Sequence, residues 1–401
     1  LPRFLGVVIL AVTSFTYVTA QINATGTIAS RALQIPFEVG VWFGLIGILL
    51  CSMLGGMRAV TWTQVAQYIV LIIAYLVPVF WMSNKLDFGL IPQFAYGDAI
   101  ARITELEVQL GIGTLEPVAG AKAGLKALSI PYVAAGETAV ESWKFVTLVF
   151  CMMTGTASLP HILMRYFTTP SVKAARQSVA WSLMFIFLLY FTAPALATFT
   201  KLQILDPNLT TSIIGKSIAD VQALDWIQKW SSVGMAQIID ANNDGILQVN
   251  EFFMRGDIVV LATPEIAGLP YVVSGLVAAG GMAAAMSTAD GLLLAIANAL
   301  SHDLYYKIID PKADTKHRLL VARVLLLAIG AAAAFVASLK LTSILGAVAW
   351  AFDFAASGLF IPIVMGIWWK RANRQGAIAS MVGGFTAGTA YLIWVAPAFL
   401  G

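Results

Sequence analysis

Charged side chains are scarce in this sequence of 401 residues. Asp, Glu, Lys and Arg make up 11% of it, against roughly 25% in an average globular domain, and only two cysteines occur. No disulfide framework is therefore indicated. The net charge of +3 is too small to indicate a nucleic-acid partner. The sequence also has no nucleophile–base pattern, phosphate loop or transition-metal cluster, so we do not predict an enzyme.

Apolar residues take the place of the missing charge. They make up 59% of the sequence, and the mean hydropathy is +0.83. A soluble domain of this length has no interior for so much apolar surface, whereas a lipid bilayer accommodates it. Apolar stretches of about 20 residues predict membrane spans. We expect nine of them, at 4–30, 37–56, 60–82, 143–163, 176–199, 266–301, 319–339, 343–369 and 376–398.

Basic residues mark alternate connections between these spans. They occur before the first span and then near Arg58, Arg165, Lys312 and Lys370. Because Lys and Arg concentrate in cytoplasmic loops, these connections are predicted to be cytoplasmic. The two long polar segments, 83–142 and 201–256, then lie outside.

Hydroxyl residues interrupt the apolar pattern of the span 266–301. Ala284, Ser287 and Thr288 are spaced i, i+3 and i+4, so they share one helix face. Two hydroxyls and a backbone carbonyl near the bilayer midplane are oxygen ligands suited to Na⁺, although Ser and Thr also bond neighbouring helices. Asp290 borders this face. An intramembrane carboxylate is a functional candidate by default, and a structural hydrogen bond is the alternative.

A second irregular point is the stretch Gly155-Thr156-Ala157-Ser158, which is followed by Leu159 and Pro160. Proline after glycine and hydroxyl residues is expected to interrupt a membrane helix. In transporters, broken helices present freed backbone groups to solutes and ions near the midplane. A simple proline kink is the alternative interpretation.

The segment 240–251 fits the calcium-loop pattern of an EF-hand at every defined position. Gly245 would make the sharp turn, and the stretch 225–239 indicates an amphipathic entering helix. We expect a weak extracytoplasmic Ca²⁺ site that serves as a structural clamp. The alternative is an Asn-Asp-Gly turn with a chance acid downstream. The predicted ligands are Asp240, Asn242, Asp244, Ile246, Gln248 and Glu251.

Several stretches together resemble the sodium:solute symporter family. They are 55–64 (GGMRAVTWTQ), 159–167 (LPHILMRYF) and 283–290 (AAAMSTAD), supported by 301–307 and 367–377. Within that family the chain is most similar to the cation/acetate symporter branch. The resemblance runs over essentially the whole sequence, with its motifs in the same order.

The resemblance implies an all-α polytopic membrane protein with a LeuT-type fold of two inverted five-helix repeats. It also implies that the first two core helices precede Leu1, so that these residues hold half of each site and do not transport by themselves. The expected division is 1–82, core helices 3–5; 83–142, extracytoplasmic loop; 143–200, core helices 6–7; 201–256, extracytoplasmic segment with the calcium loop; and 257–401, core helices 8–10 and one more.

The resemblance also assigns site residues. Ala284, Ser287 and Thr288 match the sodium ligands of the family, and Gly155, Thr156, Ala157 and Ser158 match the substrate-contacting part of the broken helix. Tyr17 and Gln21 are expected to face the cavity. Gln64 stands where many members have Asp, which puts this part of the cation path in doubt. The path residues to test are Gln64, Asp290 and Asp353.

We therefore expect a bacterial inner-membrane symporter that couples an inward Na⁺ gradient to uptake of a small monocarboxylate such as acetate. The coupling ion is Na⁺, Ca²⁺ binds at 240–251, and the partners are the solute and the lipid bilayer. No nucleic acid and no obligatory protein partner are expected. The alternatives are a symporter for another organic solute, such as an amino acid or polyol, and the membrane domain of a sensor.

Overall fold

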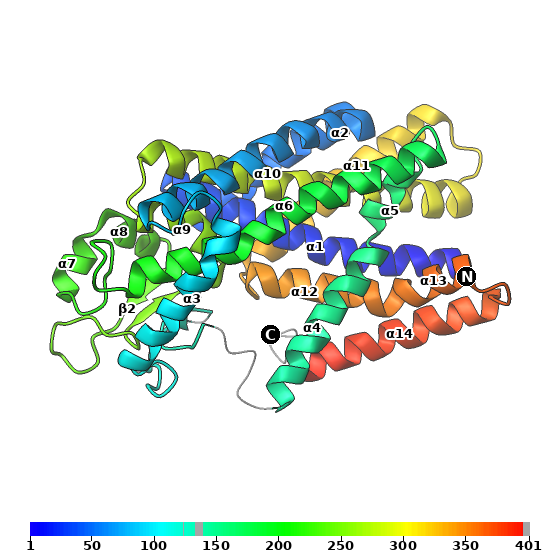
Figure 1. Ribbon diagram of the computed structural model, residues 1–401. Helices are drawn as coiled ribbons and strands as arrows, with labels where there is room; N and C mark the ends of the chain where they lie inside the picture. Colours follow the sequence, from blue (N-terminus) through cyan, green and yellow to red (C-terminus); the bar gives the residue numbers. More distant parts are fainter. Residues whose placement is uncertain (123, 133–138, 396–401) are drawn as a thin grey trace.

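The computed structural model describes residues 1–122, 124–132 and 139–395, which form a bundle of long helices with a small cap at one end (Figure 1). In the bundle, η2 and η3 are π-helical continuations of α10 and α12. The bundle elements are α1 (Pro2–Leu33), α2 (Phe37–Lys85), α4 (Ala139–Ser158), α5 (Pro160–Tyr166), α6 (Val172–Leu205), α9 (Val259–Ile266), α10 (Tyr271–Asn298), η2 (Ala299–Ile309), α11 (Thr315–Ser338), α12 (Ile344–Ala355), η3 (Ala356–Phe360), α13 (Ile361–Trp368) and α14 (Arg374–Val395).

The length and composition of these helices suit a membrane. Within the described residues, seven helical segments are long and apolar enough to cross one, and the bent pair α4–α5 makes an eighth. The nine predicted segments all coincide with these helices, although the second corresponds to the shorter apolar helix Phe37–Met53. Residues 396–398 of the last segment lie outside the described residues. The prediction of a multi-pass membrane protein is confirmed.

The two halves of α2 meet at Gly56. The backbone of this glycine is non-helical, with φ 56° and ψ −158°. Glycine adopts positive φ without steric cost, because it lacks a Cβ atom. The boundary between the predicted segments 37–56 and 60–82 therefore coincides with an interruption of the helix at Gly56.

Helix α10 lies at the centre of the bundle, packed against α1 and α2. Val18, Ile48 and Leu293 belong to the apolar cluster that these helices share. The helices approach each other closely at small residues, as is common in membranes. A Cβ atom added to Gly280, for example, would collide with the side chain of Ala74. Side chains in the middle of α10 are therefore positioned by contacts on several sides.

The cap comprises residues 86–122, 124–132 and 207–258. Its three strands form an antiparallel sheet in the order β1-β3-β2. Trp230, Phe252 and Ile258 are central to its apolar cluster. Its elements are α3 (Pro92–Gln109), β1 (Lys126–Ala127), α7 (Ile218–Ala223), α8 (Asp225–Ser232), β2 (Ala236–Ile238), β3 (Phe252–Met254) and η1 (Gly256–Ile258).

Ion pairs attach the cap to the bundle. In α3, Arg102 Nε donates to Asp206 Oδ2 at the end of α6 (2.9 Å), and Lys201 Nζ of α6 donates to Glu107 Oε1 (2.8 Å). Arg31, at the end of α1, and Trp230 of α8 both donate to Glu265 of α9. The cap is thus held to several bundle helices through charged hydrogen bonds.

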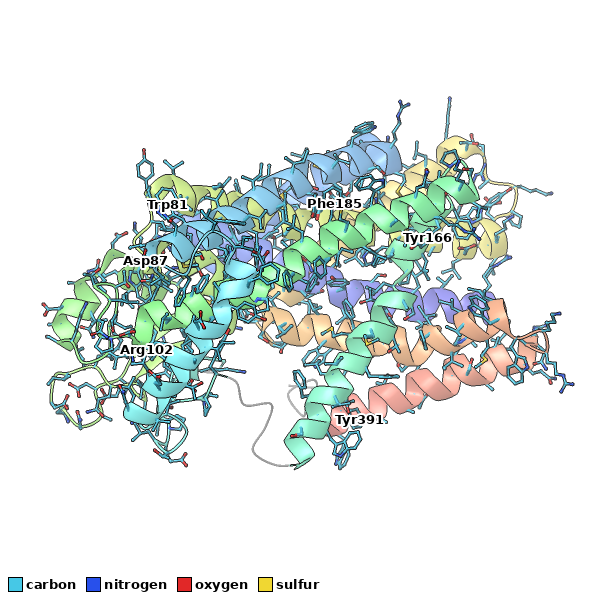
Figure 2. The ribbon with its side chains drawn as sticks, in the orientation of Figure 1. Trp81, Asp87, Arg102, Tyr166, Phe185 and Tyr391 are labelled. Atoms are coloured by element: carbon cyan, nitrogen blue, oxygen red, sulfur yellow. The ribbon has the colours of Figure 1, made fainter. Side chains whose placement is uncertain are left out.

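The end of the bundle opposite the cap carries the basic connections. Figure 2 shows Asp87 and Arg102 at the cap end and Tyr166 at the other, where the N-terminus also lies (Figure 1). The connection around Lys312 and the turn around Lys370 lie at this same end. The charge distribution follows the positive-inside rule, and the assignment of this end to the cytoplasm stays a prediction.

Candidate functional site

The proposed sodium ligands lie together in the middle of α10. Ser287 Oγ and Thr288 Oγ1 both donate to the carbonyl oxygen of Ala284, at 2.8 and 3.3 Å. The three residues are half-buried. Three oxygens are therefore gathered within one helical turn, in accordance with their i, i+3, i+4 spacing. Oxygen ligands of this kind suit a hard cation.

A neighbouring helix contacts the same turn through Gln64. Its side-chain amide Nε2, from the second half of α2, donates to the backbone carbonyl oxygen of Ser287. An amide donor occupies a carbonyl that would otherwise be open to a cation, and it brings no negative charge. The position at which the family resemblance leads us to expect Asp therefore carries a helix-to-helix hydrogen bond in this chain.

Asp290 is fully buried and hydrogen-bonded to another part of α2. Its Oδ1 accepts from Ser52 Oγ at 2.8 Å, whereas Oδ2 is buried and has no hydrogen-bond partner among the described residues. The bond to Ser52 is of the kind that the structural alternative expects, and the place of Asp290 in the cation path stays a prediction. Ser52 was not predicted, because it lies 238 residues away in sequence.

Asp353 of α12 is directed toward α14. A Cβ atom added to Gly388 would lie 3.2 Å from Asp353 Oδ2 and beside Ser357 Oγ. Both of these oxygens are buried without a hydrogen-bond partner. Asp353 thus contacts α14, whereas the hydrogen bonds of Gln64 and Asp290 join α2 to α10. The three path residues are therefore not joined in one cluster by these contacts.

The helix formed by α4 and α5 breaks at Leu159. The two parts are bent by 41°, and Leu159 has an extended backbone (φ −65°, ψ 119°) directly before Pro160. Proline has no N–H and disfavours helical geometry in the preceding residue. The break immediately follows the four predicted substrate residues.

Those four residues differ in exposure. Gly155 and Ser158 are buried, whereas Thr156 and Ala157 are exposed. Thr156 Oγ1 donates to the Met152 carbonyl (2.7 Å), and Ser158 Oγ donates to the Thr154 carbonyl (2.9 Å). Each hydroxyl therefore retains lone pairs, and Thr156 and Ala157 form the accessible part of the stretch.

Aromatic residues surround the break. The Tyr17 ring of α1 packs edge-on against His161 and Phe352, with centroids 5.8 and 5.5 Å apart. A Cβ atom at Gly155 would lie 2.8 Å from the Phe352 Cβ atom. Tyr17 is thus beside the broken helix, whereas Gln21, one turn further along α1, is half-buried.

The break and the α10 oxygens are close to each other. Helix α5 packs against α10. A Cβ atom at Gly291 would lie 3.5 Å from Arg165 Nη2 and 3.9 Å from the His161 ring. Gly291 is one turn beyond Ser287. In the sequence, Arg165 marks a basic connection and belongs to the family stretch 159–167, and nothing in the pattern indicated that its guanidinium lies beside α10.

The loop predicted to bind calcium connects β2 and β3. The predicted entering helix over 225–239 is wrong beyond Ser232, because α8 ends there and Gly234, with φ 73°, redirects the chain into β2. Among the residues that the structure describes, no three His, Cys, Asp or Glu side chains converge as metal ligands. The loop is thus a hairpin connection.

The acidic side chains of this loop mostly bond its own backbone. Asp244 Oδ1 accepts from the Ile246 N–H (2.8 Å), which lowers the pKa of the Asp244 carboxyl. Glu251 is buried and accepts from the N–H groups of Ala241 and Gln248. Asp240 Oδ2 accepts from the Gly245 N–H, but its Oδ1 is buried without a partner. One oxygen is therefore directed inward and unsatisfied.

Comparisons with known proteins agree with this architecture. A solved Na⁺-coupled sialic acid symporter, in a substrate-bound outward-open state, is similar with a TM-score of 0.52 and 14% identity, covering 96% of this chain and 74% of that one. The likeness confirms the predicted LeuT-type fold. An uncharacterised symporter from Cupriavidus necator is 38% identical, covering 99% of this chain and 69% of the relative.

A monocarboxylic acid transporter from Corynebacterium glutamicum is 26% identical, covering 98% of this chain and 62% of the relative. The model of the sodium:solute symporter family matches residues 1–223 and 258–384, which together are most of the sequence. The chain belongs to the sodium:solute symporter family.

Proposed function

We propose that this chain forms the transport core of a sodium-coupled symporter for a small monocarboxylate. The observation that carries the proposal is the position of the broken helix against α10. His161, just after the break, lies beside Gly291, one turn from Ser287 and Thr288. A solute at the break and a cation at the α10 oxygens would therefore share one region of the bundle.

In this proposal, Na⁺ is bound by the carbonyl oxygen of Ala284 and the hydroxyls of Ser287 and Thr288. Their lone pairs are available although their protons are donated within the helix. Because the site lies within the bilayer, oxygen ligands replace the water that the ion loses.

The solute site is proposed at Gly155, Thr156, Ala157 and Ser158. The break at Leu159 frees backbone groups, and the hydroxyls of Thr156 and Ser158 are groups that hydrogen-bond a carboxylate. The name of the Corynebacterium relative, which is 26% identical, supports a carboxylate substrate. The cation is proposed to pass Gln64, Asp290 and Asp353 on its way through the bundle.

The experiment is uptake of labelled acetate by the full-length protein in proteoliposomes, with and without an inward Na⁺ gradient. We expect Na⁺-driven uptake that propionate inhibits and that an amino acid or a polyol does not. Thr156→Val is expected to raise KM for acetate, and Thr104→Val, on the exposed face of α3, serves as the control. If only the amino acid or the polyol inhibits uptake, the solute is of that class and not a monocarboxylate. Absence of any uptake, with solute binding retained, would favour a sensor.

A second proposal concerns the loop 240–251, which would bind Ca²⁺ weakly at the outer face of the membrane. The unpartnered, buried Asp240 Oδ1 favours it, together with the ligand spacing of the sequence. To bind the ion, Asp244 and Glu251 would release the backbone N–H groups that they now accept from and turn their carboxylates to Ca²⁺. The remaining ligands would be Asn242, the Ile246 carbonyl and Gln248. Bound Ca²⁺ would clamp the β2–β3 hairpin.

A further inference from the structure

A cavity of about 500 Å³ lies where the cap meets the start of α12. Its charged lining is unbalanced. Lys126 of β1, Arg255 after β3 and Lys340 after α11 contribute three positive charges, and Asp257 contributes one negative charge. The cap and the bundle both supply lining residues, so the cavity exists only where the two meet.

Arg255 is the most enclosed of the three basic residues. Its side chain is 15% exposed, and its Nη2 lies 3.5 Å from Asp257 Oδ2. Among the described residues, its Nε atom is buried and has no hydrogen-bond partner. A buried guanidinium N–H group without an acceptor is unfavourable, so a small shift of this side chain that brings Nε to an anionic oxygen in the cavity would be favoured.

The start of α12 adds positive potential. Ser343 is the N-cap of this 12-residue helix, and it lines the cavity. The backbone N–H of Ile344 donates to Asp257 Oδ2 at 3.3 Å. Because a helix N-terminus carries partial positive charge, Asp257 is already held by two positive partners. Lys126 and Lys340 are exposed and, among the described residues, form no ion pair that would neutralise them.

The cavity is next to one that borders the proposed sodium site. Asp257 also lines a second, apolar cavity of about 240 Å³, and Ala284 lies on the wall of that cavity. Asp257 is therefore the residue that the walls of both cavities share.

Arg255 and Asp257 belong to the segment 224–257, which lies outside the two stretches that match the family model. Lys126 and Lys340 lie within the matched stretches. The part of the chain that departs from the family pattern thus supplies the enclosed cation of the cavity and its acidic partner.

We propose that this cavity is an anion-binding vestibule, in which Arg255 and Lys340 capture a small carboxylate before it moves to the broken helix. The proposal rests on the proposed function and on the predicted extracytoplasmic position of the cap. A positively charged cleft raises the local concentration of an anionic solute and its rate of association.

The test uses the full-length protein in proteoliposomes with labelled acetate. We expect Arg255→Gln and Lys340→Gln each to raise KM by ~3–10-fold at low salt with kcat unchanged, because the electrostatic gain acts on capture. The rise in KM should be smaller at high salt. Arg255→Lys, which keeps the positive charge, should have a KM close to that of the wild type. Lys229→Gln, which removes a lysine from the exposed face of α8, is the control for net charge.

A binding readout separates the vestibule from transport. With every native cysteine replaced by Ser, Cys51 and Cys151 included, Lys340→Cys would be labelled by an anionic thiol reagent. We expect acetate, but not neutral acetamide, to slow the labelling. Absence of acetate uptake by the wild type would overturn the proposed function, and the labelling would still decide on the vestibule. Normal uptake with unchanged KM in both Gln variants, or an equal change in Lys229→Gln, would overturn the vestibule alone.

Discussion

The side-chain amide of Gln64 donates a hydrogen bond to the backbone carbonyl oxygen of Ser287. This bond joins the second half of α2 to the turn of α10 that carries the proposed sodium ligands. An ionised Asp has no proton to donate, so the family residue could not make this contact. The chain therefore fixes this turn of α10 by a neutral bond.

Replacing Gln64 tests whether the bond positions the cation ligands. Gln64→Leu removes the donor, and a hydrogen bond of this kind contributes about 1 kcal/mol, or roughly a fivefold change in an equilibrium constant. We expect the Na⁺ concentration for half-maximal uptake to rise by about that factor. Gln64→Asp places a carboxylate beside the carbonyl and is expected to increase the dependence of thermal stability on Na⁺. An unchanged Na⁺ response in both variants would contradict this account.

The contact between Gly155 and Phe352 predicts that the broken helix tolerates no larger residue there. In Gly155→Ala, the new methyl group would lie 2.8 Å from both Cβ and the carbonyl oxygen of Phe352. Overpacking of this kind costs roughly 1–3 kcal/mol. We expect a lower unfolding temperature in detergent and slower uptake. Gly6→Ala is the matched control, since nothing lies within 4 Å of its added Cβ atom.

The breaks in the helices could be predicted from the sequence because their causes are local. Gly56 and Pro160 act on their own backbone, so the chain around each one carries the signal. The i, i+3, i+4 spacing placed Ser287 and Thr288 on one face for the same reason. The fold class followed from composition and from the family stretches.

The remaining features depend on contacts that the local sequence does not contain. Asp290 finds its partner Ser52 across 238 residues. The loop 240–251 matches a helix-flanked pattern, yet β3 pairs with the distant β1, and the flanks become strands. The vestibule likewise forms only because Lys126, Arg255 and Lys340 meet at the junction of cap and bundle.

The cap is expected to lose stability in acid through Asp206. Burial alone would raise the pKa of this carboxyl, but hydrogen bonds from Arg102 and the Asn208 N–H outweigh it and lower the pKa below its usual value. A depressed native pKa means that the stabilisation is fully present above the unfolded value of about 4 and is lost as pH falls through the native value.

The measurement is the unfolding temperature of Asp206→Asn and wild type between about pH 3 and pH 7, a window set by that unfolded value. We expect the variant to be less stable near neutral pH and the difference to narrow in acid. Asp220→Asn, at an exposed position of α7, is the control. A difference that is constant with pH would show that Asp206 acts by packing.

Calcium is expected to stabilise the cap if the loop 240–251 binds it. With a dissociation constant of about 1 mM, as in extracytoplasmic modules, about 10 mM Ca²⁺ would add about 1.4 kcal/mol to the stability of the cap. We expect Ca²⁺ to raise the unfolding temperature, a chelator to reverse the rise, and Asp240→Asn to abolish it. Asp225→Asn is the control. Equal responses of wild type and Asp240→Asn would rule out the site.

The central claim is that Ser287 and Thr288 hold the coupling ion. The most direct measurement is Na⁺-dependent acetate uptake by the full-length protein carrying Ser287→Ala and Thr288→Ala together, compared with Ser178→Ala on α6. We predict that the double variant loses Na⁺-driven uptake while Ser178→Ala retains it. Uptake by the double variant with the wild-type Na⁺ dependence would contradict the claim.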